Sequence, residues 1–398
     1  MPFSDFIGNA ETVRRLRDMM ACGHFPPAVI LAGPRGSGKY TLALMLARAM
    51  NCLERPVRSI EPEGGTLFSA LASESPESAD TDTSERPPSS STLPDFCGHC
   101  SNCVRIGLAS DLDARFAEAV EARDNMREAD KKETRIFVQT HPDIVIVPPD
   151  PPQMMIKVDQ VRHVIHGIYY RPAEARERIY IFTSSAFMKE AANSLLKVLE
   201  EPPEFATIFL LTENPGELLP TIRSRSTIFT LGALAVNEIE VQIGTLRPEW
   251  NSRQRALVAR LSEGALGRAL SFDLEGYGAA RAHGLAMLKL AIGAGDHCEL
   301  FRITESYRPG TEGRQRIESL LRALFLLVED VMFLQSGAGQ LVRNIDIQAE
   351  LKKIAEVTDF PWIEQAAARL DELERGLRRN LLRSLSLDAF AIALEKGV

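Results

Sequence analysis

The sequence contains no run of the roughly 20 consecutive apolar residues that a membrane-spanning helix requires. Its first fifteen residues, MPFSDFIGNAETVRR, also lack the apolar core of a signal peptide. We therefore expect a cytoplasmic protein that makes no membrane contact. The chain also lacks an excess of positive charge, because 54 acidic residues outnumber 46 Lys and Arg and the formal net charge is −8. This deficit argues against broad, sequence-blind wrapping of nucleic acid, which requires a basic surface, although it does not exclude a local basic patch.

Cysteine is also scarce, with six residues in a chain of 398. Disulfides are a poor explanation for cysteines in a large chain without an export signal. In the stretch CGHCSNC, Cys97, Cys100 and Cys103 have C-x₂-C-x₂-C spacing. Three thiolates this close need one further ligand to complete a tetrahedral Zn²⁺ site. Cys52 is the best candidate for that ligand and His99 the second, while an iron–sulfur cluster lacks a fourth cysteine shortly after the third.

Short apolar, β-branched segments recur in the first 231 residues, at 28–33, 143–149, 178–183 and 206–212. Helical patterns lie between them. This alternation predicts a parallel β-sheet that is covered by helices on both faces. After about residue 231 no further strand pattern occurs, and the rest of the chain is predicted to be helical.

Two insertions, 56–95 and 108–135, interrupt the alternating pattern, and the sequence assigns no role to either. Residues 73–95 are rich in Ser, Pro and acidic residues and contain almost no apolar residue. Such a segment cannot offset the entropy lost on ordering, so it is predicted to be disordered. The charged, Ala-rich segment 111–133 predicts an exposed helix.

The stretch LAGPRGSGKY, residues 31–40, departs from the phosphate-loop pattern G-x-x-x-x-G-K-[ST] only at its last position. Tyr40 stands where a Ser or Thr hydroxyl normally ligates Mg²⁺, and Thr41 points about 100° away around the following helix. The backbone N–H groups and the lysine would hold phosphates, so ATP or ADP binding stays open. The candidate nucleotide-contacting residues are Gly33, Gly36, Gly38, Lys39 and Thr41.

Hydrolysis would need two acids at the end of the strand 178–183, one near Mg²⁺ and one to orient water. Phe182 and Thr183 occupy these two positions instead. Because the Mg²⁺ hydroxyl and both acids are absent together, we predict that the chain has no ATPase activity of its own. The loop then either binds nucleotide without hydrolysis or only keeps its fold.

Several longer motifs resemble those of one family, the bacterial replicative clamp loaders, which are a branch of the AAA+ ATPases. These motifs are FIGN at 6–9, NC at 51–52 followed by CGHCSNC, THPDIVIV at 140–147, ANSLLKVLEEPP at 192–203 and TIRSRS at 221–226. The last resembles the family's Ser-Arg-Cys motif, with Ser226 in place of Cys. The resemblance covers nearly all of residues 1–231 and continues more weakly into the C-terminal half.

This resemblance implies an α/β fold in three parts. The first is an AAA+ RecA-like parallel-sheet domain at 1–231, with a zinc module at 52–103 that contains the insertion 73–95. A small helical lid at 232–277 and an all-α collar domain for oligomerisation at 278–398 would follow. The resemblance also implies that the metal is structural zinc on Cys52, Cys97, Cys100 and Cys103.

Within the family, the gamma/tau motor subunits keep the full loop, the Asp-Glu pair and a lid arginine. Gly267 falls where that arginine would be. The delta-prime branch typically has a degraded site but keeps Ser-Arg-Cys, and this chain matches that combination. By itself the turn at 221–229 fits a surface arginine as well as an arginine finger. The resemblance implies that Arg225 is a finger that acts in trans on a neighbour's ATP.

The implied partners are the gamma/tau and delta subunits in a hetero-pentamer of DNA polymerase III, the sliding clamp, and primed DNA reached mainly through the complex. The acidic charge suits a subunit whose main contacts are proteins. One alternative is an ATP-hydrolysing gamma/tau-type motor, against which the missing acids speak. Another is a zinc-dependent DNA-binding module unrelated to clamp loading, but CGHCSNCVRIGLASDLD has one Arg and two Asp rather than a basic face.

Overall fold

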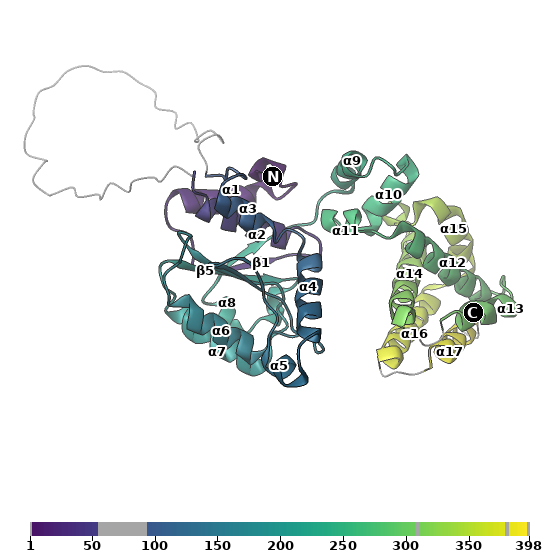
Figure 1. Cartoon of the computed structure of the whole chain (residues 1–398). Coiled ribbons are helices and arrows are strands. Elements are labelled where there is room, and N and C mark those ends of the chain that lie inside the picture. Colours follow the sequence, from purple (N-terminus) through teal and green to yellow (C-terminus); the bar gives the residue numbers. More distant parts are fainter. Residues whose placement is uncertain (1, 55–93, 308–310, 379–381, 396–398) are drawn as a thin grey trace, which may run out of the picture. The chain divides into compact units, whose positions relative to one another are not determined.

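The computed structural model describes residues 2–54, 94–307, 311–378 and 382–395. They form two compact units, Met1–Gly232 and Ala233–Val398 (Figure 1). The predicted disordered segment 73–95 lies outside the described residues apart from Pro94 and Asp95. None of the helices in the described ranges is long and apolar enough to cross a bilayer.

The first unit contains a six-stranded sheet with the strand order β2-β3-β4-β5-β1-β6. Its strands are β1 (Ala28–Ala32), β2 (Val138–His141), β3 (Ile144–Val147), β4 (Arg178–Phe182), β5 (Ala206–Thr212) and β6 (Thr227–Thr230). All neighbouring pairs are parallel except β2 with β3. The predicted parallel sheet is thus confirmed, but two of its strands, the antiparallel edge strand β2 and the strand β6, were not predicted.

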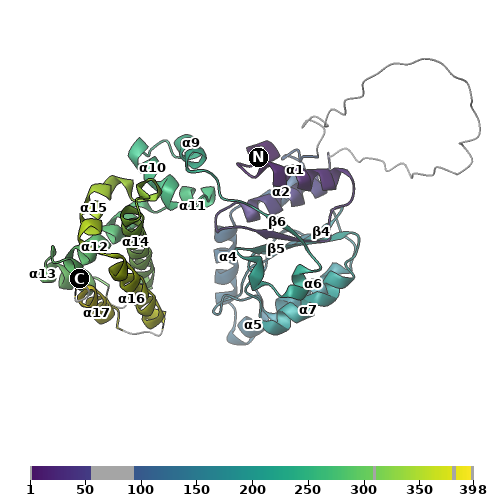
Figure 2. The same ribbon diagram turned by 180° about the vertical axis from the view of Figure 1, so that it is seen from behind.

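Helices cover both faces of this sheet (Figures 1 and 2). One layer holds α1 (Ala10–Ala21), α2 (Lys39–Asn51) and α3 (Ser101–Gly107), and the other holds α6 (Val158–Ile168), α7 (Lys189–Glu200) and α8 (Pro220–Arg223). Strand β1 serves both layers because successive side chains alternate across a strand. Val29 and Leu31 belong to the core beneath α2, whereas Ala28, Ile30 and Ala32 belong to the core beneath α6 and α7.

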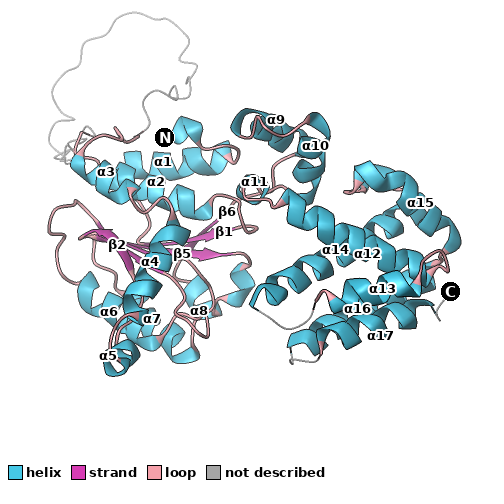
Figure 3. Ribbon diagram, turned by 45° about the vertical axis from the view of Figure 1, so that its right-hand side comes forward, coloured by secondary structure: helices cyan, strands magenta, loops and turns pink. Residues whose placement is uncertain are grey.

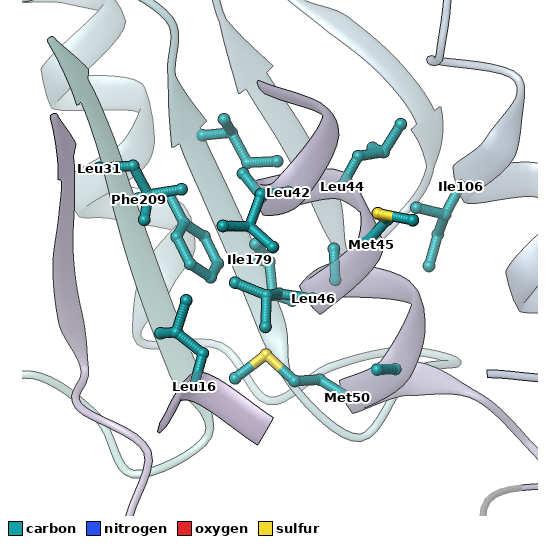
Figure 4. Close-up of a cluster of buried hydrophobic side chains, with 14 of the residues drawn as sticks. Leu16, Leu31, Leu42, Leu44, Met45, Leu46, Met50, Ile106, Ile179 and Phe209 are labelled. Carbon is teal, nitrogen blue, oxygen red and sulfur yellow. The ribbon is translucent and has the colours of Figure 1, made fainter. Parts of the chain in front are cut away.

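The core beneath α2 fixes the position of the candidate loop. Figure 4 shows Leu42 and Leu46 of this helix beside Leu31 and Phe209 of the sheet. Nearly every residue from Leu42 to Asn51 is buried, so α2 is packed on almost all sides. At about 25 cal/mol per Å² of apolar area, such burial is the main stabilising contribution to this layer.

The segment 111–133, predicted to be one exposed helix, forms two: α4 (Leu112–Asp124) and α5 (Glu128–Glu133). No residue of α4 is buried, as expected from its charge. Asn125 ends α4, and the chain re-enters a helix after Arg127. α4 contacts the edge strand β2, so the insertion lies against the one antiparallel edge of the sheet.

The second unit contains no strand among its described residues (Figure 3). Its helices are α9 (Val236–Leu246), α10 (Ser252–Leu261), α11 (Leu266–Leu270), α12 (Leu274–Ala291), α13 (His297–Glu305), α14 (Thr311–Gln335), α15 (Gln348–Val357), α16 (Phe360–Arg378) and α17 (Arg383–Glu395). A small core joins α9, α10 and α11, and a larger one around the buried Trp362 joins α12 to α17. The division into a lid at 232–277 and a collar at 278–398 stays a prediction, and α12 runs across that boundary.

Candidate functional site

The glycine loop lies between the end of β1 and the start of α2, as the sequence predicts. Gly36 and Gly38 have φ values of +82° and +86°, a region that side chains rarely adopt. A Cβ on Gly33 would lie 2.5 Å from the carbonyl oxygen of Leu231, which follows β6. Glycine is therefore required at these positions by the backbone itself, whether or not a phosphate binds.

Lys39 lies folded over the loop that it would serve. Its Nζ donates hydrogen bonds to the carbonyl oxygens of Gly33 and Pro34, at 2.6 and 2.8 Å. Burial lowers the pKa of Lys39, and the nearby carboxylate of Glu213 opposes that shift. Glu213 comes directly after β5, the neighbour of β1, and sequence reasoning missed it. The sequence signal that could have revealed Glu213 is its position directly after a predicted strand of the parallel sheet.

The N-terminal FIGN segment packs against the same loop. A Cβ on Gly38 would lie 3.0 Å from Cε2 of Phe6. Asn9 accepts a hydrogen bond from the N–H of Gly232 at 2.7 Å and donates one to its carbonyl oxygen at 3.3 Å. The segment thus joins the loop to the last residue of the first unit.

Tyr40 does not offer its hydroxyl to the loop. The hydroxyl donates a 2.6 Å hydrogen bond to the carbonyl oxygen of Ala109, just after α3, and the ring packs against the core beneath α2. Burial raises the pKa of Tyr40 well above its usual range, so the hydroxyl remains a donor. Thr41 is exposed. Tyr40 therefore anchors α3 to α2.

We expect Tyr40→Phe to lower the free energy of unfolding of the first unit by about 1 kcal/mol, the net value of a typical buried hydrogen bond. The substitution leaves the carbonyl of the fully buried Ala109 without this donor. Chemical denaturation would measure the change, with Tyr170→Phe on an exposed ring as the matched control. Equal losses in both variants would mean that the Tyr40 hydroxyl contributes nothing specific.

The two positions that would need acids for hydrolysis are structural in this chain. Phe182 is fully buried at the end of β4, in the core beneath α6 and α7. The backbone N–H of Thr183 bonds to the carbonyl of Val147 and so extends the pairing of β3 with β4. Neither side chain can take the role of the missing carboxylates.

The four predicted metal ligands come together at the far end of α2. The Sγ atoms of Cys52, Cys97, Cys100 and Cys103 all lie within 4.8 Å of one another. A tetrahedron with Zn–S bonds of about 2.3 Å has S–S separations of about 3.8 Å, which lie within this bound, so the set is compatible with Zn²⁺. The backbone N–H of Cys97 points to Sγ of Cys52 at 3.4 Å, and that of Cys100 to Sγ of Cys97 at 3.3 Å. His99, the second candidate for the fourth ligand, lies in a different group of residues.

A buried polar network holds this cluster against the sheet. Asn102 of α3 donates to the carbonyl of Asn51 at 3.0 Å and lies 3.2 Å from Nε2 of His141. Nδ1 of His141 accepts from the N–H of Asp143 at 3.2 Å. Asp143 in turn accepts three backbone N–H bonds from residues 173–175. The THPD motif therefore fixes the Cys103 helix and the loop before β4 through hydrogen bonds.

His141 is 1% exposed, and burial, aided by the charge of Arg105, lowers its pKa. In the unfolded chain a histidine takes up a proton near pH 6.5, but the folded protein resists it. Stability is therefore present above about pH 6.5 and falls as the pH drops towards the lower folded pKa. We expect an NMR pH titration to show that His141 takes up its proton at a lower pH than a histidine in the unfolded chain. Protonation of His141 at the same pH as in the unfolded chain, or at a higher one, would contradict the expectation.

Arg225 lies in the turn between α8 and β6. Its Nη2 lies 2.8 Å from Oε1 of Glu200 at the end of α7, and its Nη1 donates to the carbonyl of Thr221 at 3.1 Å. About a third of the side chain is exposed. Sequence reasoning expected an arginine in a solvated turn and missed Glu200, because nothing in the spacing of residues 200 and 225 indicates that they meet.

Comparison with known proteins gives a consistent family. The family model described as DNA polymerase III, delta subunit, matches residues 83–235. DNA polymerase III subunit tau of Escherichia coli (strain K12) is 26% identical over 274 residues, which cover 68% of this chain and 32% of that protein. Subunit delta' of the same strain is 30% identical over 219 residues, which cover 54% of this chain and 62% of that protein. The chain thus matches about a third of the length of the tau relative.

Two solved structures from Thermotoga maritima are also similar. A DNA polymerase III gamma subunit-related protein is 20% identical and has a TM-score of 0.33. The match covers 73% of this chain and 91% of that protein's chain. The RuvB Holliday junction branch migration motor is 14% identical, covers 88% of each chain, and has a TM-score of 0.34. At TM-scores this low, the likeness adds nothing to the assignment.

The segment that matches the family model contains three of the four clustered cysteines, the THPD motif and Arg225. The relatives in both branches, tau and delta', extend the same likeness over more than half of the chain. These findings together support a clamp-loader family member related to gamma/tau.

Proposed function

We propose that the chain is a non-hydrolysing, delta-prime-type subunit of the replicative clamp loader of DNA polymerase III. In this proposal it stands in a hetero-pentamer with gamma/tau and delta subunits and offers Arg225 to the ATP site of a neighbouring motor subunit. ATP at that site helps the ring to open the sliding clamp and to place it on primed DNA. This chain meets the DNA mainly through the complex, and its helical second unit acts as the collar.

The observation that carries this proposal is the position of Arg225 relative to the strands β1 and β6. β1 and β6 are parallel neighbours, with Val29 opposite Thr227. Arg225 precedes β6, whereas the loop follows β1 from Gly33 onward. The four residue steps from Val29 to Gly33 alone span about 13 Å, which is more than an arginine side chain reaches. Arg225 and the chain's own loop therefore lie beyond opposite ends of the strand pair, which supports a role in trans.

Zinc held by the four clustered cysteines would be structural in this proposal. A closed set of four thiolates leaves no open position for water or substrate. The ion would cross-link the end of α2, at Cys52, to α3, which carries Cys103. Binding of ATP or ADP at the loop remains open in the proposal, since Lys39 would have to leave the carbonyls of Gly33 and Pro34 to meet a phosphate.

Co-purification with differently tagged gamma/tau and delta subunits would test the proposal. A delta-prime-type subunit should enter a five-subunit complex, which gel filtration followed by native mass spectrometry would detect. Absence from every such complex, with the purified chain folded, would refute the assignment.

We expect the isolated protein to show no ATP turnover above background with Mg²⁺ and primed DNA. Tyr40→Thr should not restore it, because Phe182 and Thr183 still occupy the acid positions. Steady-state phosphate release would measure this, with Lys39→Ala as the control for contaminating activity. Turnover that Lys39→Ala abolishes would contradict the expectation.

ATP turnover that Lys39→Ala abolishes would favour a second candidate, an ATP-hydrolysing gamma/tau-type motor. One observation supports this candidate, since the tau relative aligns with a larger share of this chain than delta' does, 68% against 54%. The complete set of loop glycines and Lys39 points the same way. The side chains at positions 40, 182 and 183 outweigh both, because hydrolysis needs chemistry that they cannot supply.

A further inference from the structure

A second group of metal-ligand types lies beside the cysteine cluster. An oxygen of Glu54, the Sγ of Cys97 and a ring nitrogen of His99 all lie within 4.8 Å of one another. Cys97 belongs to both groups, while Glu54 and His99 are exposed. The two groups therefore share one thiol, with the cysteine cluster on the inner side and the mixed group facing solvent.

The hydrogen bonds of His99 orient its ring as a metal ligand. Nδ1 lies 3.0 Å from the carbonyl oxygen of Cys97, an acceptor, so this nitrogen carries a proton. Nε2 lies 2.8 Å from Oε1 of Glu54, a contact that needs either a proton on Nε2 or a cation in the place of that proton. A backbone carbonyl that holds the other ring N–H is the usual support of a metal-bound histidine. A cation bound by both Nε2 and Oε1 would take the place of that proton.

Charge favours a second cation at this place. Four thiolates around one Zn²⁺ leave a formal charge of −2 on the cluster. The backbone N–H of Cys100 satisfies only one lone pair of Cys97 Sγ, at 3.3 Å. A thiolate has further lone pairs, so Cys97 can donate to an ion on each side. The ligand types S, N and O together suit Zn²⁺ or Co²⁺, and water would complete the tetrahedron.

We propose that Glu54, Cys97 and His99 form a second, solvent-exposed site for a divalent transition metal, with the Cys97 thiolate bridging to the ion of the four-cysteine cluster. The proposal rests on the metal-bound form of that cluster in the proposed function. The exposed site has three protein ligands, two of them on the surface, and should therefore bind more weakly than the closed one.

The test is an anaerobic titration of the metal-free, reduced full chain with Co²⁺. Thiolate-to-metal charge transfer and the visible d–d bands report occupancy, and elemental analysis checks the stoichiometry. The wild type should bind two equivalents, a tight one and a weaker one with a distinct visible spectrum. His99→Gln and Glu54→Gln should each bind one, with the tight spectrum retained. His24→Gln, at another exposed histidine, should still bind two.

A single equivalent in the wild type would overturn the proposal and leave Glu54 and His99 as an ordinary ion pair. Two equivalents that persist in His99→Gln would overturn it as well. If the wild type binds no metal at all, both the four-cysteine metal site and the bridged second site are refuted. None of these results bears on assembly with gamma/tau and delta, so the clamp-loader proposal fails or survives by its own experiment.

Discussion

Replacing Arg225 with alanine is expected to slow DNA-stimulated ATP hydrolysis by a reconstituted clamp loader at least tenfold while the complex still assembles. An arginine finger stabilises the charge that develops on the transferred phosphoryl group and is worth about 10³–10⁵ in rate where it acts alone. A ring with several ATP sites should lose less, because sites without this finger continue to turn over. Steady-state hydrolysis and clamp loading by wild-type and mutant complexes measure the effect, with assembly checked by gel filtration.

The ion pair of Arg225 with Glu200 supplies the matched control. Glu200→Gln removes the carboxylate at 2.8 Å but keeps the guanidinium and its hydrogen bond to Thr221. A partly exposed ion pair of this kind contributes little to stability, so both variants should fold. A trans-acting finger predicts a large loss in Arg225→Ala and a small change in Glu200→Gln. Equal rates in all three intact complexes would make Arg225 a surface residue with a local partner.

Removal of the metal is expected to have the second large effect, on stability rather than on rate. Structural Zn²⁺ contributes about 10–16 kcal/mol of apparent binding free energy in zinc-finger peptides. If the bound ion stabilises the first unit against unfolding by only about 3 kcal/mol, removal of the ion lowers the thermal midpoint of that unit by roughly 6–12 °C. The large core beneath α2 should survive, because its residues extend well beyond the cysteines. The loss should therefore centre on α3 and its links to α2.

Cys103→Ser and chelation of the wild type should give matching results in differential scanning calorimetry. Cys103 is buried within α3, so its loss should abolish tight binding of one equivalent of zinc. Cys22→Ser, at an exposed cysteine outside the cluster, is the control and should melt like the wild type. A Cys103→Ser protein with unchanged melting and a full equivalent of tightly bound zinc would exclude this cysteine from the site.

The central strands and the strand–loop–helix unit could be predicted from sequence because each depends on a local pattern, whereas the order of the strands in the sheet was not predicted. The buried runs AVILA and ATIFLLT predict central parallel strands. A strand, a glycine loop and a helix in succession predict the phosphate-loop shape. The spacing of three cysteines predicted that they contribute to one metal site, and the structure brings their thiols together with that of Cys52. Strands β2 and β6 were missed because each has only four residues, VQTH and TIFT, which is too short a run to give a clear strand pattern.

The partners of individual side chains could not be predicted in the same way. Tyr40 meets Ala109, and Arg225 meets Glu200, across long stretches of sequence that carry no mutual signal. Such pairs depend on how helices lie on the sheet, which only the folded chain determines. Sequence reasoning could say that Tyr40 fails as a Mg²⁺ ligand, but it could not say what the tyrosine does instead.

Helix α2 is a rigid rod of thirteen residues, about 20 Å long, with Lys39 at one end and Cys52 directly after the other. A shift of one residue along its axis, about 1.5 Å, would draw Lys39 from the carbonyls of Gly33 and Pro34 and Cys52 from the other three thiols at once. A change that displaces either end of the helix therefore displaces both. The loop lysine and glycines of a chain with Phe182 and Thr183 at the acid positions then need no nucleotide as their explanation, since the loop also aligns the helix that it starts.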